Sequence, residues 1–429
     1  MLEESETRRH MLTPIALQRL NNDGWLLFAT RFIRLFAYGS LSVVLVFYLV
    51  GIGLSEPQIG MLLTLTLVGD TVVSLFLTTR ADRIGRRRML VVGAALMVAA
   101  GLVFASTSSL WLLLLAGTVG VISPSGHEVG PFLSIEQAAL SHVVTDRTRT
   151  EVFAWYTLAG SLATALGALA GGAVTRALQQ TAMPPVNSYR MVVVLYAALG
   201  VVLVVLFSQL SRQAEATTLG EKKAFRATFA GFSGLDRSRE IVLKLSALFA
   251  LDSFGGGFVI QSFAAYWFYL RFGVNPGTLG AIFFWANIFA GISALLASRL
   301  AARFGLIRTM VATHLPSNVL LILVPLMPTL SLAVLVLLVR FSISQMDVPT
   351  RQSYIMAVVR PEERSAAAGV TGVARTIGAA ISPLFVGFMF ARPALINWPF
   401  FIAGMLKITY DLMLYRKFVA VQPPEEMHS

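Results

Sequence analysis

Long apolar stretches separated by short polar turns recur along the chain, and many approach the roughly 20 residues needed to cross a bilayer core of about 30 Å. In the first half we expect membrane spans near 25–50, 56–79, 89–107, 109–140, 151–178 and 189–211. In the second half we expect them near 241–271, 276–302, 307–327, 330–358, 364–391 and 397–416. The pattern therefore predicts an all-α membrane protein of twelve transmembrane helices.

One long polar stretch, residues 212–240, divides these spans into two groups of six. We therefore expect five regions: an N-terminal segment 1–24, a six-helix half 25–211, a linker 212–240, a second six-helix half 241–417 and a tail 418–429. Three spans carry internal breaks, because Pro124, Gly126 and Pro131 interrupt the fourth, Gly255–Gly257 weaken the seventh, and Pro349 interrupts the tenth.

The second half resembles the first when the two are aligned at one constant shift, with no gap across two spans. The shift aligns Gly53, Gly60, Arg83, Gly85 and Arg88 with Gly273, Gly280, Arg303, Gly305 and Arg308. Internal repeats of this kind are typical of secondary transporters, whose sites lie near the bilayer midplane between the repeats. The two six-helix halves are therefore predicted to be pseudo-symmetric.

Composition supports a membrane location and explains the basic charge. Only 13% of the residues are charged, about half of the roughly 25% found in soluble domains, which argues against a water-soluble enzyme. Of the 34 Lys and Arg residues, 24 fall on the side of the predicted termini and linker, four on the other side and six within the spans. This bias predicts cytoplasmic termini in a cell membrane and explains the net charge of +12 without a nucleic-acid partner.

The loop between spans 2 and 3 carries a motif, Gly69-x8-Thr78-x3-Asp82-Arg83-x-Gly85-Arg86-Arg87. It resembles the signature G-x8-G-x3-D-[RK]-x-G-[RK]-[RK] of the major facilitator superfamily, with Thr78 in place of one glycine. The resemblance implies a conformational gate, in which Asp82 meets the positive amino terminus of another helix. It extends that role to Arg83, Gly85, Arg86 and Arg87, and to Arg303 and Gly305 of the second copy. The alternative for the arginines is a plain positive-inside loop.

Span 5 contains Ala154-x8-Ala163-x3-Gly167-Ala168-x2-Gly171-Gly172. The stretch is similar to the glycine–proline signature of drug:proton antiporters, but it lacks the proline and has alanine at two glycine positions. The resemblance implies efflux by exchange with protons. Small residues four apart also allow two helices to pack closely in any membrane protein, and this alternative stays open.

Ionisable residues inside the spans are candidates for function, because burying them in a bilayer is costly. Arg34 and Arg340 are expected roughly 14 to 15 Å from the membrane surface, near the midplane. With Tyr38 one turn beyond Arg34, they are candidates for binding an anionic or zwitterionic substrate. The alternative is a charge network in which the two arginines neutralise Asp252 or Glu128.

Buried carboxylates are candidates for proton coupling, since desolvation favours their protonated form. Asp252 is the first choice because it lies near the midplane beside three glycines, and Asp70 and Glu128 follow. We expect the other buried charges nearer the cytoplasmic side to form structural ion pairs, with Lys407 and Asp411 pairing one helical turn apart.

Several other chemistries are excluded by the sequence. The chain has no cysteine for a thiolate metal site, no Walker-type loop for ATP and no HExxH zinc motif. We expect no enzymatic activity, metal or cofactor. The sequence predicts a monomeric secondary active transporter of a small organic solute, working by alternating access with proton-coupled efflux. The alternatives are uptake or exchange of an organic anion through Arg34 and Arg340, and a non-transporting sensor on a transporter scaffold.

Overall fold

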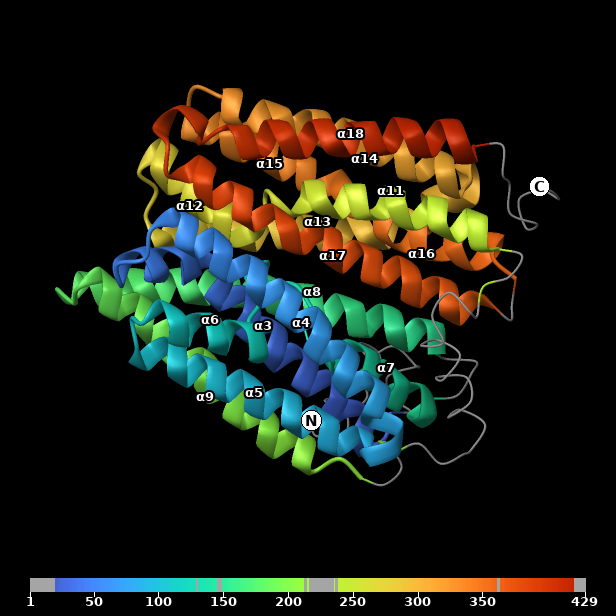
Figure 1. The fold of residues 1–429 in the computed structure, drawn as a ribbon, viewed down its shortest axis with the longest axis horizontal. Helices are drawn as coiled ribbons and strands as arrows, with labels where there is room; N and C mark the ends of the chain where they lie inside the picture. The colour runs from blue at the N-terminus through green and yellow to red at the C-terminus, as the bar shows by residue number, and fades with distance from the viewer. Residues whose placement is uncertain are drawn as a thin grey trace, which may run out of the picture.

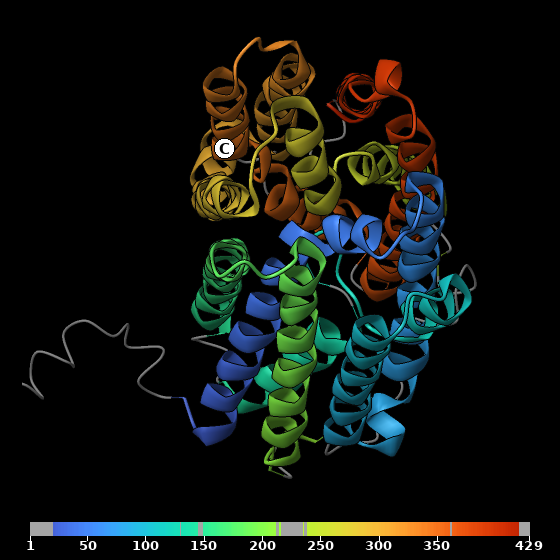
Figure 2. The same cartoon turned by 90° about the vertical axis from the view of Figure 1, so that its left-hand side faces the viewer.

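The computed structural model describes residues 20–128, 130–144, 149–211, 214–215, 235, 238–360 and 363–419, and all regular structure within them is helical. Most of the predicted tail and most of the predicted linker lie outside these residues. The helices form two stacked groups, blue to green and yellow to red in Figure 1, and Figure 2 shows them nearly end on. The all-α prediction is confirmed.

Each group contains six membrane-crossing segments. The first consists of α3 (Asn22–Gly51), α4 (Glu56–Ile84), α5 (Arg86–Ser106), α6 (Leu110–Val119) with α7 (Phe132–Val143), α8 (Arg149–Gln180) and α9 (Pro185–Ser208). The second consists of α11 (Arg239–Gly257) with α12 (Gln261–Phe272), α13 (Pro276–Phe304), α14 (Leu306–Leu323) with a 3-10 turn, α15 (Leu330–Ser344) with α16 (Asp347–Val358), α17 (Arg364–Phe390) and α18 (Trp398–Phe418). Ten segments are apolar and long enough to cross a membrane, and α6 with α7 and α18 complete the twelve.

Local sequence signals set several helix starts, and the apolar outer faces suit a bilayer. The Asn21 side chain accepts the Gly24 N–H at 2.9 Å at the start of α3, and Asn275 does the same for Thr278 at 3.0 Å in α13. Large apolar side chains point outward along many spans, among them Trp111 at 77% exposed and Val72 at 61%. Such surfaces are stable against lipid and not against water.

The predicted internal repeat is present in the helix geometry. Both bounds of α13, Pro276–Phe304, follow those of α4, Glu56–Ile84, by the same interval that separates Gly305 from Gly85. These two glycines join the helices to the next ones with positive φ angles of 117° at Gly85 and 82° at Gly305. Only glycine adopts such angles readily. The two halves therefore share the turn as well as the helices.

The halves meet closely at one end of the bundle, the end that holds Gly51 and Phe272, which we name the closed end. At one crossing Gly60 of α4 faces Gly387 of α17, and at the other Gly172 of α8 faces Gly280 of α13. A Cβ at Gly60 would lie 2.5 Å from the Pro383 carbonyl oxygen, so only glycine permits this approach.

The opposite end, which holds Asn22 and Phe418, is the open end. A central cavity of about 390 Å³ lies between the halves. A vestibule of about 800 Å³, lined by residues of α7, α16 and α17, lies on the open side of it, and Arg351 and Arg375 line both spaces. The structure therefore gives access from the open end.

Candidate functional site

Three spans are unwound beside the central cavity, each near its predicted glycines or prolines, although in the tenth span the break precedes Pro349, which lies inside α16. In span 4 the helix ends at Val119 and resumes at Phe132, and the tenth span breaks between Ser344 and Asp347. Spans 4 and 10 occupy corresponding positions in the two halves. Unwound backbone at membrane depth is tolerated where it lines a cavity, and paired breaks of this kind indicate the binding site of a transporter.

The break in span 7, between α11 and α12, seals the cavity toward the closed end. The Ser262 hydroxyl lies 2.5 Å from the carbonyl oxygen of Pro124 and 2.8 Å from that of Ser42. Gln261 donates to the Ser42 hydroxyl at 2.7 Å. The first bond satisfies a backbone carbonyl freed by the break in span 4, and all three tie the two halves together.

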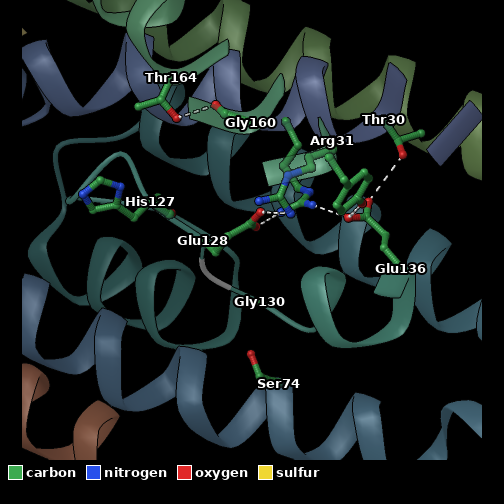
Figure 3. A network of polar contacts seen from close by, with 12 residues as sticks. Thr30, Arg31, Ser74, His127, Glu128, Gly130, Glu136, Gly160 and Thr164 are labelled. Carbon is green, nitrogen blue, oxygen red and sulfur yellow. Dashed lines mark hydrogen bonds and ion pairs between the residues drawn. The ribbon is translucent and has the colours of Figure 1, made fainter. Parts of the chain in front are cut away.

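The first half holds a compact group of charges, which we name the N-terminal charge cluster. Arg34 is fully buried and contacts Glu128 and, at 2.5 Å, Glu136. Arg31 contacts Glu128 at 2.7 Å, and the Tyr156 hydroxyl donates to Glu136 at 2.5 Å. Figure 3 shows Glu128 turned toward Arg31 while the neighbouring His127 points the other way. Two arginines and two glutamates thus neutralise one another.

The structure separates the three residues expected to bind substrate. Arg340 lines the central cavity, whereas Arg34 and Tyr38 are not among its lining residues. The Arg34 guanidinium lies 5.9 Å from the centre of the Tyr38 ring and is held by the two glutamates. Of the two roles that the sequence left open for Arg34, the geometry favours the charge network.

The second half holds a C-terminal charge cluster around Asp252. Lys407 donates to one oxygen of Asp252 at 2.6 Å, and Arg351 donates to the other at 3.1 Å. Arg351 also contacts Asp347 at 3.1 Å. The expected pairing of Lys407 with Asp411 one turn away is therefore wrong, because the buried lysine reaches across to α11 instead.

Asp411 pairs with His314, a residue that the sequence argument did not single out. A ring nitrogen of His314 lies 2.8 Å from the Asp411 carboxylate, and its other nitrogen lies 3.8 Å from Asp252. Asn318 donates to Asp411 at 2.9 Å. The only sequence signal for this residue was a histidine inside the ninth apolar span. Its carboxylate partners lie on other spans.

Three charged residues at the cavity differ from these clusters. Asp70 accepts the Gly130 N–H at 2.5 Å and lies 3.4 Å from the Ser74 hydroxyl, and no cation of the described residues lies within 4.0 Å of it. Arg340 and Arg375 each have a buried Nε without a hydrogen-bond partner. Neither arginine has a carboxylate within 4.0 Å among the described residues.

The structure describes part of the motif between spans 2 and 3. Asp82 and Arg83 lie in α4, but their side chains are outside the described residues. A carboxylate does cap the following helix, although it belongs to Glu215, which accepts the backbone N–H of Arg86 at 2.6 Å and of Arg87 at 3.2 Å. Gly85 and the equivalent Gly305 form the turns, and Arg303 is exposed beside the latter.

The sequence is similar to one family model and to one full-length relative. A sequence model of the Major Facilitator Superfamily matches residues 27–383 and 245–428. An uncharacterized membrane protein of Saccharomyces cerevisiae is 33% identical over 421 residues, which cover 92% of this chain and 94% of the relative.

Solved structures show the same fold at low identity. The nucleoside transporter NupG has a TM-score of 0.69 at 16% identity, covering 93% of this chain and 99% of its own. A D-xylose–proton symporter has 0.69 at 14%, covering 92% and 97%. The human organic anion transporter MFSD10 has 0.61 at 15%, covering 94% and 100%.

Proposed function

Because the chain belongs to the major facilitator superfamily, a family of secondary transporters, we propose that it moves a small organic solute across a cell membrane in exchange for protons. The observation that carries this proposal is Asp70, a buried carboxylate at the central cavity with no cation in contact among the described residues. The cavity between the two halves supplies the solute site.

Alternating access follows from how the halves touch. Their close crossings lie toward the closed end, where glycines let α4 approach α17 and α8 approach α13. The vestibule separates α7 of one half from α16 and α17 of the other at the open end. Rocking the halves about the cavity would open the first contacts and close the vestibule, as packed surfaces with two arrangements allow.

Three carboxylates were candidates for proton coupling, and their surroundings differ. Asp252 is held by Lys407 and Arg351, and Glu128 by Arg31 and Arg34. Protonation of either carboxylate would leave buried cations without their partner, which is costly inside a membrane. Asp70 has hydrogen bonds only, so its protonation leaves no cation uncompensated. We therefore place the exchangeable proton on Asp70.

The hydrogen bond from Gly130 gives this proton a mechanical consequence. The Gly130 N–H points to the Asp70 carboxylate from the unwound part of span 4, where Gly130 has a φ of 79°. A charged acceptor makes this bond roughly twice as strong as a neutral one. Protonation of Asp70 would loosen span 4, which also carries Glu128 of the N-terminal charge cluster.

We propose cytoplasmic termini, a plasma-membrane location and efflux. The excess of basic residues on the side of the termini supports the orientation. In that orientation the vestibule faces the cytoplasm, so the solute would enter from there. The loop motif, with Asp82 and Arg83 beside Gly85, would regulate this closure together with its second copy at Arg303 and Gly305.

Vesicle transport tests the proposal. Purified protein in proteoliposomes with an internal pH dye would be given a panel of organic solutes, with and without a pH gradient. We expect at least one solute to move protons, and Asp70→Asn to abolish this movement while counterflow of the same solute continues. Asp23→Asn, which changes a buried acid that bonds Ser211 away from the cavity, is the matched control. Gradient-driven transport that survives Asp70→Asn would refute the assignment.

A second candidate function is uptake or exchange of an organic anion. The position of Arg340 in the central cavity favours it, and MFSD10, described as an organic anion transporter, has this fold. Arg34, the other residue expected to bind an anion, already contacts Glu128 and Glu136. The same vesicle experiment separates the two functions, because exchange of an anion would proceed without a pH gradient.

A further inference from the structure

Two arginines at the central cavity have no carboxylate in direct contact among the described residues, although Asp252 and Asp347 attract both at longer range. Arg340 projects from α15 and Arg375 from α17, and both line the cavity between the halves. Their buried Nε atoms lack hydrogen-bond partners, and no described carboxylate lies within 4.0 Å of either group. Arg375 lies near enough to Arg351 for their positive charges to repel each other.

Other buried cations in the spans are compensated by the protein itself. Arg31 and Arg34 contact glutamates, and Arg351 and Lys407 contact Asp252. An uncompensated charge at membrane depth is costly, so such residues face a water-filled cavity or a partner. Here the missing partner is not supplied by the described part of the chain.

The charge of the vestibule agrees with an anionic ligand. Three arginines, Arg351, Arg364 and Arg375, line it, and its described lining contains no Asp or Glu. A cleft lined by one sign of charge raises the local concentration of ligands of the opposite sign. The entrance therefore attracts anions toward the two unpaired guanidinium groups.

The remainder of the central cavity is mixed in character, and its lining includes Asp70, Glu128, Asp252 and Asp347, of which the last three contact cations. Phe341 follows Arg340 directly, and the Phe341 ring centre lies 5.0 Å from the guanidinium carbon. Phe283 and Leu337 add apolar surface, while Asn287 donates to Gln261 at 3.1 Å. A space of about 390 Å³ accepts a small organic molecule with an apolar body.

We propose that Arg340 and Arg375 bind the anionic group of an organic carboxylate or phosphate whose apolar body packs against Phe283, Leu337 and Phe341. The site rests on the proposed transport function and specifies its substrate class. Guanidinium groups bind both oxyanions through paired N–H donors. Arg351 is held and compensated by Asp252 and Asp347, so the other two arginines make the contact.

Binding to the purified protein in detergent tests this site without transport. Thermal unfolding would be followed at pH 7 with three matched sets: benzoate, benzamide and benzylamine; hexanoate and hexanamide; phenyl phosphate and phenol. We expect a saturable rise in the melting temperature with at least one anion and none with its neutral or cationic match. The carboxylate and phosphate sets show which oxyanion is preferred.

Variants then locate the anion. Arg340→Gln and Arg375→Gln should each weaken binding about 10- to 100-fold, the loss expected for a charged hydrogen bond. Arg340→Lys should retain part of the affinity. Arg392→Gln, at an exposed arginine of the closed end, should bind normally. Binding that is unchanged in both glutamine variants, equal shifts with the neutral compounds, or no shift with any of the anions would overturn the proposal.

The binding and transport experiments can fail separately, because one tests the anion site and the other tests proton coupling. If a neutral solute is carried in response to a pH gradient and no anion binds, the substrate class is wrong and proton-coupled transport stands. If an anion binds through both arginines but moves without protons, the site stands and the coupling through Asp70 is wrong.

Discussion

The two halves share a scaffold but balance their buried charges differently. In the first half, two arginines face three carboxylates, and the carboxylate left over is Asp70. In the second half, three arginines and Lys407 face three aspartates, and the unpaired groups are Arg340 and Arg375. The helix bounds of α4 repeat in α13, whereas the buried charges do not repeat.

The groups that stabilise the fold occur in both halves, whereas the charged groups that can bind a proton or a solute differ between the halves. The glycine crossings and the turns at Gly85 and Gly305 occur in both halves because close packing needs them twice. The unpaired charges differ between the halves, with Asp70 lining the cavity from the first half and the two arginines from the second. An acid from one half and two arginines from the other suit joint handling of a proton and an anion.

The largest expected effect comes from opening the N-terminal charge cluster. Arg34→Gln would leave Glu128 with Arg31 only and Glu136 without a cation, so we expect a loss of about 3–5 kcal/mol in the free energy of unfolding. Thermal or denaturant unfolding in detergent measures it, with Arg392→Gln as the control. A loss no greater than that of the control would show that this cluster is not a structural element.

The equivalent change in the C-terminal charge cluster should be smaller. Asp252→Asn removes the only carboxylate that Lys407 contacts among the described residues, but Arg351 keeps Asp347 at 3.1 Å. We expect a loss of about 2 kcal/mol in the same unfolding measurement, below the usual range for a broken buried pair because part of the network survives. A loss larger than that of Arg34→Gln would reverse the order of the two clusters.

The two glycine crossings should respond alike. A Cβ would lie 2.5 Å from the Pro383 oxygen in Gly60→Ala and 2.7 Å from the Ala168 oxygen in Gly280→Ala. Overpacking of about 1–3 kcal/mol should push the halves apart at the closed end. Because the chain has no native cysteine, Ala264→Cys in the cavity lining reports opening through its rate of labelling by a membrane-impermeant maleimide.

Gly372→Ala is the control for this pair, since its Cβ would meet nothing within 4 Å. Faster labelling in only one of the two crossing variants would show that the halves are not mechanically equivalent.

The smallest effect should come from the cap of α5. Glu215→Gln keeps an acceptor for the N–H groups of Arg86 and Arg87 but removes the negative charge at the helix amino terminus. We expect a loss of about 0.3–1 kcal/mol that disappears at high salt. Unfolding at low and at high sodium chloride concentration measures it. An effect that does not depend on salt would contradict the electrostatic explanation.

The fold was largely predictable because its signals are local. Apolar length sets the spans, proline and glycine set the breaks in spans 4 and 7, and the repeat that aligns Gly85 with Gly305 is visible without structure. Pairing was less predictable. The sequence placed Lys407 beside Asp411 by helical spacing, yet it binds Asp252, 155 residues away. Spacing gives the face of one helix, while its rotation against the others depends on packing throughout the bundle.

The site shows the same limit. Arg340 could be selected by its depth, and it does line the cavity, but the depth of Arg34 gave no sign of the two glutamates around it. Arg375 and His314 stand out only when neighbouring spans are in place. Their significance depends on which partners are near them, and a single sequence does not contain that relation.

The equal number of acids and bases within the spans has an electrical consequence. Six bases, Arg31, Arg34, Arg340, Arg351, Arg375 and Lys407, face six acids, Asp70, Glu128, Glu136, Asp252, Asp347 and Asp411. A membrane voltage of 100 mV does work of about 2.3 kcal/mol on each net charge that crosses. With the embedded charge summing to zero, a joint displacement of these groups does no net electrical work, and the charges of the cargo and the proton then set the work of transport. Exchange of a monovalent anion for one proton would move negative charge in one direction and positive charge in the other, so each cycle would carry two charges through the voltage, whereas exchange of a neutral solute for a proton would carry one.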